Sequence, residues 1–340
     1  MLTDIFAIRY EETPIFKLFG VRETRVLHQC FTILEEFHPY WGEEKSRETS
    51  SETFWKEVHK RVANELGQRW LSHPFYTAMV GLAEYRREES RHYPHLEIVR
   101  NWYSAKIQDD NNPDMFIKER LSVVEVGFRL KYEVAQNVNE SLKGLSQNDL
   151  LYLTGKPQVE RYESAVDELN TRFRQGRLPL NYHNGFIQLE KDGLIAREIE
   201  QPFWSVVSDP IWANVDLDMK EALDQLDTGG KDPAFYAGKA LESTLKIISN
   251  GLGVTHGGER GAHNFIDNLG RQGVQFVEKW EAEQLKEYFT KIRNPLGHGP
   301  GHEPMPALKH DQSSWAIEVA MSWIKMLVQR YTTIKCDTGS

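Results

Sequence analysis

Arg293, Asn294 and His298 lie close together in the segment KIRNPLGHGPGHEP, which runs from Lys291 to Pro304. Arginine has a planar fork of N–H donors that binds two phosphate oxygens at once. Histidine has a pKa close to neutral, so it gives or takes a proton at physiological pH. If these side chains converge, they form the kind of site that cleaves a phosphodiester bond.

The backbone of this segment must leave a regular helix if the three side chains are to meet. In an α-helix, residues five positions apart are separated by about 140° around the axis, so Arg293 and His298 would face different directions. Pro295 lacks a backbone N–H donor and disfavours a helical conformation at Asn294. The glycines and the proline in the following sequence, GHGPG, let the chain turn sharply. The sequence therefore predicts a broken helix end at which the three side chains converge.

Each candidate residue also has an explanation without catalysis. Arg293 near a helix C-terminus interacts favourably with the helix dipole, by about 0.3–1 kcal/mol. His298 in a glycine-rich loop can satisfy backbone carbonyl groups. Glu242 and Lys246, on an upstream predicted helix, have the favourable i,i+4 order of a surface ion pair, which contributes about 0.2–0.5 kcal/mol. Both kinds of explanation stay open for the sequence alone.

Histidines in this region suggest a zinc site as an alternative, with His256, His298, His302 and His310 as ligands. A His-x3-His pair binds zinc when a helix aligns both rings, and the sequence GPG between His298 and His302 disfavours a helix. No cysteine is near these histidines, and the chain has neither a GKS/GKT phosphate loop nor a GxSxG elbow. We expect neither a metal nor another cofactor.

The segment resembles the motif of the HEPN superfamily, in which an arginine, a following polar residue and a histidine four to six positions later define the site. Arg293-Asn294, three residues and His298 match that motif within IRNPLGHG. The upstream sequence ALESTLK strengthens the match, because Glu242 and Lys246 stand where many HEPN domains carry a glutamate and a basic residue four apart. The resemblance covers about 110 residues, from 231 to the C-terminus.

The resemblance implies a helical, metal-independent endoribonuclease that uses the 2′-hydroxyl of the RNA as nucleophile. His298 would take the proton of that hydroxyl or give one to the leaving 5′-oxygen, Arg293 would stabilise the developing charge, and Asn294 would orient an oxygen or the histidine. The products would be a 2′,3′-cyclic phosphate and a 5′-hydroxyl, and DNA would not be cut. Four further residues are candidates for supporting the site or contacting RNA: Glu242, Lys246, Lys291 and His302.

A weaker resemblance lies upstream, where ELNTRFRQGRLPLNYHNGFIQL, residues 168–189, and the following helix are similar to the middle region of bacterial abortive-infection proteins. The two resemblances together imply a toxin-like ribonuclease in defence against phage. They also imply a homodimer through the C-terminal helical domain, and a phage-derived trigger or a regulatory protein acting through the N-terminal domain. Two rivals are a catalytically inactive HEPN module for dimerisation or RNA binding, and a toxin whose loop is modified by a partner enzyme.

Charge composition gives no independent support for nucleic-acid binding. The net charge is −9, with 13 basic and 12 acidic residues from Lys231 to the end and 28 against 38 in the first 230 residues. Proteins that hold long nucleic acid through phosphate contacts usually carry a basic face. We therefore expect RNA to meet a small local site or a partner's surface.

The remaining bulk features indicate a cytoplasmic protein with no membrane contact. The first residues, MLTDIFAIRYEETP, carry charges where the apolar core of a signal peptide would stand. The most apolar stretch, Trp315 to Val328, is too short to span a bilayer. Cys30 and Cys336 are far apart and suggest a reduced compartment.

Periodicity predicts a mainly α-helical, two-domain protein. An N-terminal helical domain, 1–205, would contain helices at 21–38, 54–70, 113–142 and 159–174 and a β-hairpin at about 178–200, with its turn at the KDG sequence 191–193. A connecting helix, 206–230, would precede a HEPN-like domain at 231–335. The predicted elements of that domain are helices at 232–250, 262–269, 274–292 and 313–333, with loops at 251–261 and 295–311.

Three surfaces have competing interpretations. The hairpin could act as a DNA-contacting wing, but its acidic residues disfavour phosphate, and we expect it to close the N-terminal domain. The basic and aromatic run at 85–95 is interrupted by Glu88 and Glu89, which favours a solvated helix face over an RNA contact. The last helix is apolar on two sides, one of which is a candidate dimer surface. Trp315, Val319, Trp323, Met326 and Leu327 form one side, and Ile317, Ala320, Ile324, Val328 and Tyr331 form the other.

Overall fold

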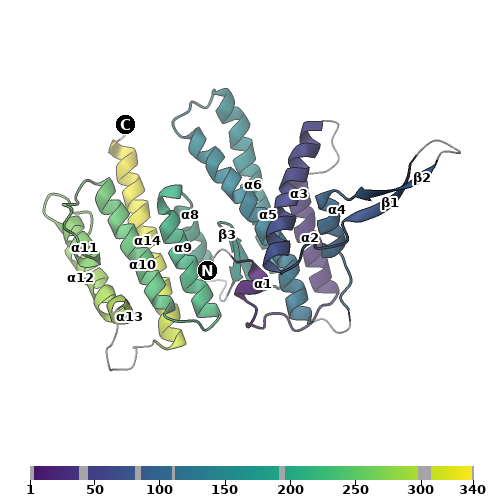
Figure 1. Cartoon of the computed structure of the whole chain (residues 1–340). Coiled ribbons are helices and arrows are strands. Elements are labelled where there is room, and N and C mark those ends of the chain that lie inside the picture. The colour runs from purple at the N-terminus through teal and green to yellow at the C-terminus, as the bar shows by residue number, and fades with distance from the viewer. Residues whose placement is uncertain are drawn as a thin grey trace. The chain divides into compact units, whose positions relative to one another are not determined.

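The computed structural model describes residues 4–37, 45–80, 86–108, 112–190, 196–297 and 308–338. The protein is mainly α-helical, and its described part contains two small two-stranded sheets (Figure 1). It divides into an N-terminal unit, Thr3–Gln188, and a C-terminal unit, Leu189–Ser340 with Met1–Leu2. The predicted fold class, mainly α with a small hairpin, is confirmed.

The N-terminal unit is built around one long helix, α5, which contacts α1, α2, α3 and α6. The helices of this unit are α1 (Phe6–Arg9), α2 (Val21–Phe37), α3 (Lys45–Glu65), α4 (His95–Tyr103), α5 (Pro113–Leu142) and α6 (Leu150–Gln175). Helix α5 has the predicted bounds, because Pro113 suits a first-turn position and the Asn112 side chain accepts a hydrogen bond from the backbone N–H of Asp114. Helix α6 begins nine residues before the predicted start at 159. Asp149 is its N-cap, and the Asp149 side chain accepts a hydrogen bond from the backbone N–H of Leu151.

The described residues of the unit form two hairpins, of which the sequence predicted one. Strands β1 (Phe75–Val80) and β2 (Arg87–His92) pair antiparallel in a mostly exposed hairpin, which projects from the unit in Figure 1. The helix face predicted for 85–95 is therefore wrong for residues 87–92. Arg87 and Glu89 pair at 2.7 Å on one face of β2, because side chains two apart share a face of a strand.

The second hairpin consists of β3 (Leu180–His183) and β4 (Phe186–Leu189). Its turn is Asn184-Gly185, where both residues have positive φ, as a two-residue hairpin turn requires. The predicted KDG turn lies outside the described residues, and residues 196–200, predicted to belong to the hairpin, form the π-helical turn η2 (Ala196–Glu200). Both strands are largely buried, which fits a hairpin that closes the unit and contradicts a projecting wing.

A buried carboxylate joins three elements of the N-terminal unit. Glu125 on α5 is fully buried between Arg9 of α1 and Arg129, its i+4 neighbour. It also accepts a hydrogen bond from the backbone N–H of Ile187 in β4 at 2.9 Å. Arg9 and Arg129 in turn donate to the carbonyls of Ile187 and Gly185. Glu125 therefore fixes α1 and the hairpin onto α5.

Replacing Glu125 with alanine is expected to lower the stability of the chain by about 3–5 kcal/mol, because it leaves two buried guanidinium groups without their carboxylate. The measurement is urea unfolding followed by circular dichroism. Glu140→Ala, on the same helix, is the control. Its exposed pair with Lys143 predicts a change below about 1 kcal/mol. Equal effects of the two substitutions would contradict this account of Glu125.

The C-terminal unit is a helical bundle (Figure 1) in which α10 (Pro233–Gly251) packs against both α9 (Ala213–Asp227) and α14 (His310–Thr338). The segment predicted as a connecting helix thus belongs to this bundle as α9. The other elements are α8 (Gln201–Val206), η3 (Pro210–Trp212), α11 (Ala262–Gly270), α12 (Lys279–Tyr288), η4 (Phe289–Arg293) and α13 (Asn294–Gly297). Helix α12 begins five residues after the predicted Val274, because Glu278 and Glu281 form a capping box there.

One side of α14 lies in the core of its unit, with Ile317, Ala320, Ile324 and Val328 buried. Leu327 is fully buried as well and does not belong to the other side, where the sequence placed it. On that other side Trp315 is 57% exposed, and Val319, Trp323 and Met326 are half-buried. A second apolar strip on α14 therefore reaches the surface.

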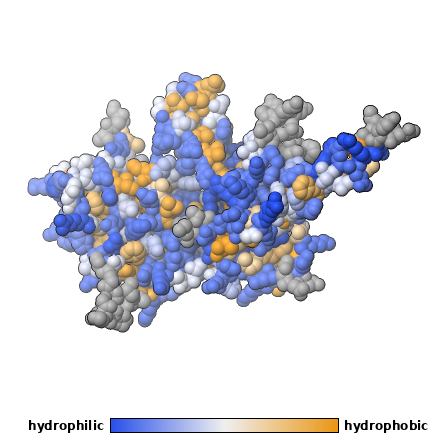
Figure 2. All heavy atoms as spheres, in the orientation of Figure 1, coloured by the Kyte–Doolittle hydropathy of each residue, from blue (hydrophilic) through white to orange (hydrophobic). Residues whose placement is uncertain are grey.

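The face shown in Figure 2 is mostly hydrophilic, and one of its several hydrophobic patches lies where α6 follows α5. Leu150, Leu151 and Leu153 at the start of α6 are 75%, 66% and 58% exposed. Among the described residues, no helix combines the length and hydropathy needed to cross a membrane.

Candidate functional site

Arg293 ends an irregular stretch of helix. It is the last residue of η4, a π-helical turn inserted between α12 and α13. The backbone N–H of Asn294 bonds to the carbonyl of Phe289, five residues back, and Asn294 has helical dihedrals (φ −66°, ψ −39°). The prediction that Pro295 drives Asn294 out of the helical region is therefore wrong. The missing donor and the ring of Pro295 are accommodated by the wider π turn before it.

The side chain of Arg293 lies against one face of α10. Its Nη2 is 2.8 Å from Oε2 of Glu242, and both side chains are half-buried. Its Cζ lies 5.3 Å from the ring centroid of Phe235, close enough for a cation–π contact. Phe235, Gly238 and Glu242 are spaced i, i+3 and i+7, so they share the face of α10 that meets Arg293.

Gly238 makes this approach possible. A Cβ at this position would lie 2.5 Å from Cγ and 2.8 Å from Cβ of Arg293, closer than packed carbon atoms come. Gly238 and Phe235, which support the arginine, are not among the site residues that the sequence predicted. The signal available was a lone glycine inside a strongly helical segment, which often marks close packing.

Glu242 and Lys246 do not act as the surface pair that their spacing suggested. The carboxylate of Glu242 faces Arg293, while Lys246 is exposed and forms no ion pair within the described residues. The structure therefore brings Glu242 to the candidate site and leaves Lys246 outside its contacts. Lys291 is likewise exposed.

The helix end that carries Arg293 is fixed to the rest of the bundle by Tyr288. This residue is buried, its hydroxyl donates to the carbonyl of Ala316 on α14 at 3.0 Å, and burial raises the pKa of the phenol above its usual value. The neutral hydroxyl is thus a permanent donor at physiological pH. It anchors α12 to α14 directly before the π turn.

Of the three predicted catalytic residues, the structure describes two. Asn294 is half-buried beside Arg293, and Nε of Arg293 is buried with no hydrogen-bond partner among the described residues. His298 and His302 lie outside the described residues, as does most of the predicted loop 295–311. The convergence of Arg293 with His298 stays a prediction.

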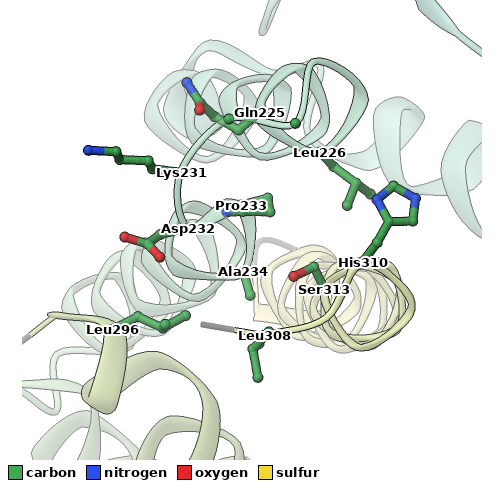
Figure 3. Close-up of a pocket in the computed structure, with 12 residues that line it drawn as sticks. Gln225, Leu226, Lys231, Asp232, Pro233, Ala234, Leu296, Leu308, His310 and Ser313 are labelled. Atoms are coloured by element: carbon green, nitrogen blue, oxygen red, sulfur yellow. The ribbon is translucent and has the colours of Figure 1, made fainter. Parts of the chain in front are cut away.

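A pocket of about 460 Å³ lies where the chain leaves α13 and enters α14 (Figure 3). Leu296, the last buried residue before His298, and Leu308, which follows the undescribed segment, both line it. The side chains of Lys231 and Asp232 point to the side opposite His310. The described residues contain no group of three or more His, Cys, Asp or Glu side chains placed to hold a metal ion.

Comparison with protein families assigns the N-terminal part of the chain. The family AbiJ N-terminal domain 4 matches residues 4–205, more than half of the chain. The chain belongs to this family. It is therefore an abortive-infection (Abi-like) protein. Neither the curated proteins nor the solved structures that were compared give a match.

The AbiJ N-terminal domain 4 match includes the sequence 168–189, on which the abortive-infection resemblance rested, so that part of the prediction is confirmed. It extends through η2 and most of α8 and ends before α9. Arg293 and Glu242 lie outside the matched range. The HEPN assignment of residues 231–335 thus stays a prediction drawn from the residues themselves.

Gly238→Ala is expected to destabilise the AbiJ-family chain by about 1–3 kcal/mol, because the new methyl group would overlap Arg293. Helix propensity alone would make the alanine variant more stable by up to about 1 kcal/mol. The sign of the change in unfolding free energy therefore distinguishes overlap with Arg293 from helix propensity. The measurement is thermal unfolding by calorimetry. Gly270→Ala is the control, because its nearest neighbour would lie at an ordinary 3.6 Å. A variant at 238 as stable as the wild type would contradict the close packing.

Proposed function

We propose that this chain is a toxin-like, metal-independent endoribonuclease of HEPN type that acts in abortive-infection defence against phage. Its C-terminal unit would cut RNA, and its AbiJ-family N-terminal unit would sense a phage-derived trigger or bind a regulatory protein. The defence role is supported by the family match. The nuclease activity is supported by the residues around Arg293.

The observation that carries the proposal is the way Arg293 is held. A solvated surface arginine samples many rotamers, whereas this one is confined by Phe235, Gly238 and Glu242 at an irregular helix end. Glu242 engages Nη2 and so fixes the orientation of the guanidinium plane, including that of Nη1. A preorganised cation of this kind stabilises charge on a phosphoryl group without reorganisation cost.

The proposed reaction is a transesterification, in which one phosphoester bond forms as another breaks. The 2′-hydroxyl oxygen attacks the adjacent phosphorus, the bond to the 5′-oxygen breaks, and the products are a 2′,3′-cyclic phosphate and a 5′-hydroxyl. The hydroxyl loses a proton and the 5′-oxygen gains one, and His298 would carry out one of these two transfers. Arg293 would bind the equatorial oxygens as the phosphorus becomes five-coordinate, while Asn294 orients an oxygen or the imidazole.

A second candidate function is a HEPN-like module without catalysis, which would serve dimerisation or RNA binding in a larger defence assembly. Two observations favour it. The chain from Lys231 onward is nearly neutral, and Glu242 already compensates the charge of Arg293. A compensated arginine attracts an RNA phosphate less strongly than a free one.

The nuclease is tested with purified full-length protein and a mixed-sequence RNA in EDTA. The wild type is expected to cut the RNA and leave 2′,3′-cyclic phosphate ends. Arg293→Ala should lower the rate about 10²–10³-fold through lost charge stabilisation, and His298→Ala about 10²–10⁴-fold through lost proton transfer. Expression of the wild type should be toxic and that of both variants tolerated.

Glu287→Gln, an exposed change on α12, is the control and should keep the wild-type rate. The cleavage rate of Glu242→Gln should lie between those of the wild type and Arg293→Ala, because this change weakens the positioning of Arg293 without removing it. If the wild type leaves RNA intact in EDTA, and all variants are equally tolerated in cells, the inactive module replaces the nuclease.

We further propose that two copies associate through the exposed side of α14. Trp315 is 57% exposed there, next to the half-buried Val319, Trp323 and Met326. Large aromatic side chains contribute much of the binding energy in protein interfaces. Pairing along α14 would also place two Arg293 side chains in one assembly.

Sedimentation equilibrium tests this interface. The wild type is expected to form a dimer, and Trp315→Glu should weaken it by at least about tenfold, because a charge would be buried in the contact. Trp280→Glu on α12 is a matched control, since Trp280 is 56% exposed. A monomeric wild type, or equal effects of both substitutions, would rule out the α14 interface.

A further inference from the structure

A small pocket on the N-terminal unit combines cations, amides and aromatic rings. It has a volume of about 290 Å³ and lies where the end of α3 meets the turn after it and the start of α4. Its volume is close to the lower limit for sites that hold small organic ligands. Its side chains are Lys56, His59, Lys60, Ala63, Asn64, Gln68, Arg69, Trp70 and His95.

Within the part of the chain that the structure describes, the lysines and the arginine of this pocket lack carboxylate partners. Lys56 and Lys60 are an i,i+4 pair of like charge on one face of α3, an arrangement that destabilises a helix. Neither lysine, nor Arg69, forms an ion pair with a carboxylate of the described residues. The neighbouring i,i+4 pair on α3 is compensated, because Arg61 forms an ion pair with Glu57 at 2.8 Å.

The acidic residue best placed to neutralise Lys56 is engaged elsewhere. Glu52 is four residues before Lys56, in the order that favours an ion pair. Its carboxylate instead accepts hydrogen bonds from the backbone N–H of His95, at 3.1 Å, and from Nδ1 of His95, at 2.5 Å. Glu52 therefore stabilises the start of α4 and orients His95, and the two lysines are left for an external anion.

His59 forms an uncharged part of the pocket's inner wall. Nε2 of His59 accepts a hydrogen bond from the backbone N–H of Leu71 at 3.3 Å. Burial, followed by the neighbouring His95 and His92, lowers the pKa of His59 to about 4, so the ring is uncharged at physiological pH. His95 uses Nδ1 for Glu52, which leaves Nε2 as its remaining ring nitrogen.

Trp70 supplies an aromatic surface beside the cations. The indole is half-buried, with ring centroids of His59 and His92 at 5.0 and 5.2 Å, so its position is fixed by packing. Indole faces stack on planar heterocycles, and the amides of Asn64 and Gln68 can pair with donors and acceptors on the edge of a base. Cations, an aromatic plane and amides together match a phosphate attached to a nucleobase.

We propose that this pocket binds a free nucleotide, with the phosphate held by Lys56, Lys60 and Arg69 and the base placed on Trp70. A free nucleotide fits better than a nucleic-acid strand because the pocket is small and the first 230 residues carry 38 acidic against 28 basic residues. The site lies in the AbiJ-family domain and not in the unit that carries Arg293. It thus gives the N-terminal unit a ligand, independently of the nuclease.

The test uses the full chain carrying Arg293→Ala, so that cleavage does not interfere, and isothermal titration calorimetry with AMP, GMP, CMP and UMP. At least one nucleotide is expected to bind with a Kd below about 1 mM. Inorganic phosphate and the matching nucleoside should each bind at least about tenfold more weakly, because each offers only half of the contacts. Lys56→Gln with Lys60→Gln, and Trp70→Leu separately, should each weaken binding at least about tenfold.

Lys143→Gln with Lys156→Gln is the matched control, because it removes the same charge from lysines that pair with Glu140 and Glu160, and it should leave the Kd unchanged within about twofold. Circular dichroism of each variant checks that it is folded. Three results would overturn the proposal: no binding of any nucleotide at millimolar concentration, inorganic phosphate binding as tightly as the nucleotides, or a 5′-phosphorylated RNA octamer binding tenfold more tightly than its mononucleotides.

Discussion

The ion pair between Arg293 and Glu242 is the contact on which the C-terminal unit's candidate chemistry depends. The two side chains come from segments about fifty residues apart and are both half-buried, so each needs the other's charge. Removing one partner of such a pair costs more than the pair itself contributes, because the remaining charge stays partly desolvated. The pair therefore fixes where the guanidinium sits as much as it adds stability.

Three features of the bundle make that contact possible. Gly238 lets the arginine reach the surface of α10, the π turn η4 rotates Arg293 relative to α12, and Tyr288 ties the end of α12 to α14. The first two features are unfavourable by themselves, because an internal glycine weakens a helix and a π turn has poorer hydrogen-bond geometry. Their combination at one residue is typical of positions where geometry matters more than local stability.

The N-terminal unit uses charges in two contrasting ways. Around Glu125, two arginines and one carboxylate are buried together and matched by backbone groups, which holds α1 and the hairpin on α5. Around Trp70, by contrast, three cations border a pocket and lack carboxylate partners among the described residues. The first arrangement explains folding without a ligand. The second leaves the charges of Lys56, Lys60 and Arg69 uncompensated within the described residues, and an anion in the pocket would compensate them.

The sequence by itself determined the mainly helical fold, the bounds of α5, the presence of a hairpin near residue 180 and the abortive-infection family. These depend on local signals: apolar periodicity, a cap at Asn112, the strand pattern after Gly185 and a contiguous motif. The sequence predicted Arg293 and Glu242 as site residues but did not predict that they pair. It also predicted a helix break at Pro295, where the helix continues. Only the tertiary structure decided the partner of Glu242, the role of Gly238 and the pocket around Trp70. The physical reason is that each depends on distances between helices, which periodicity within one helix does not encode.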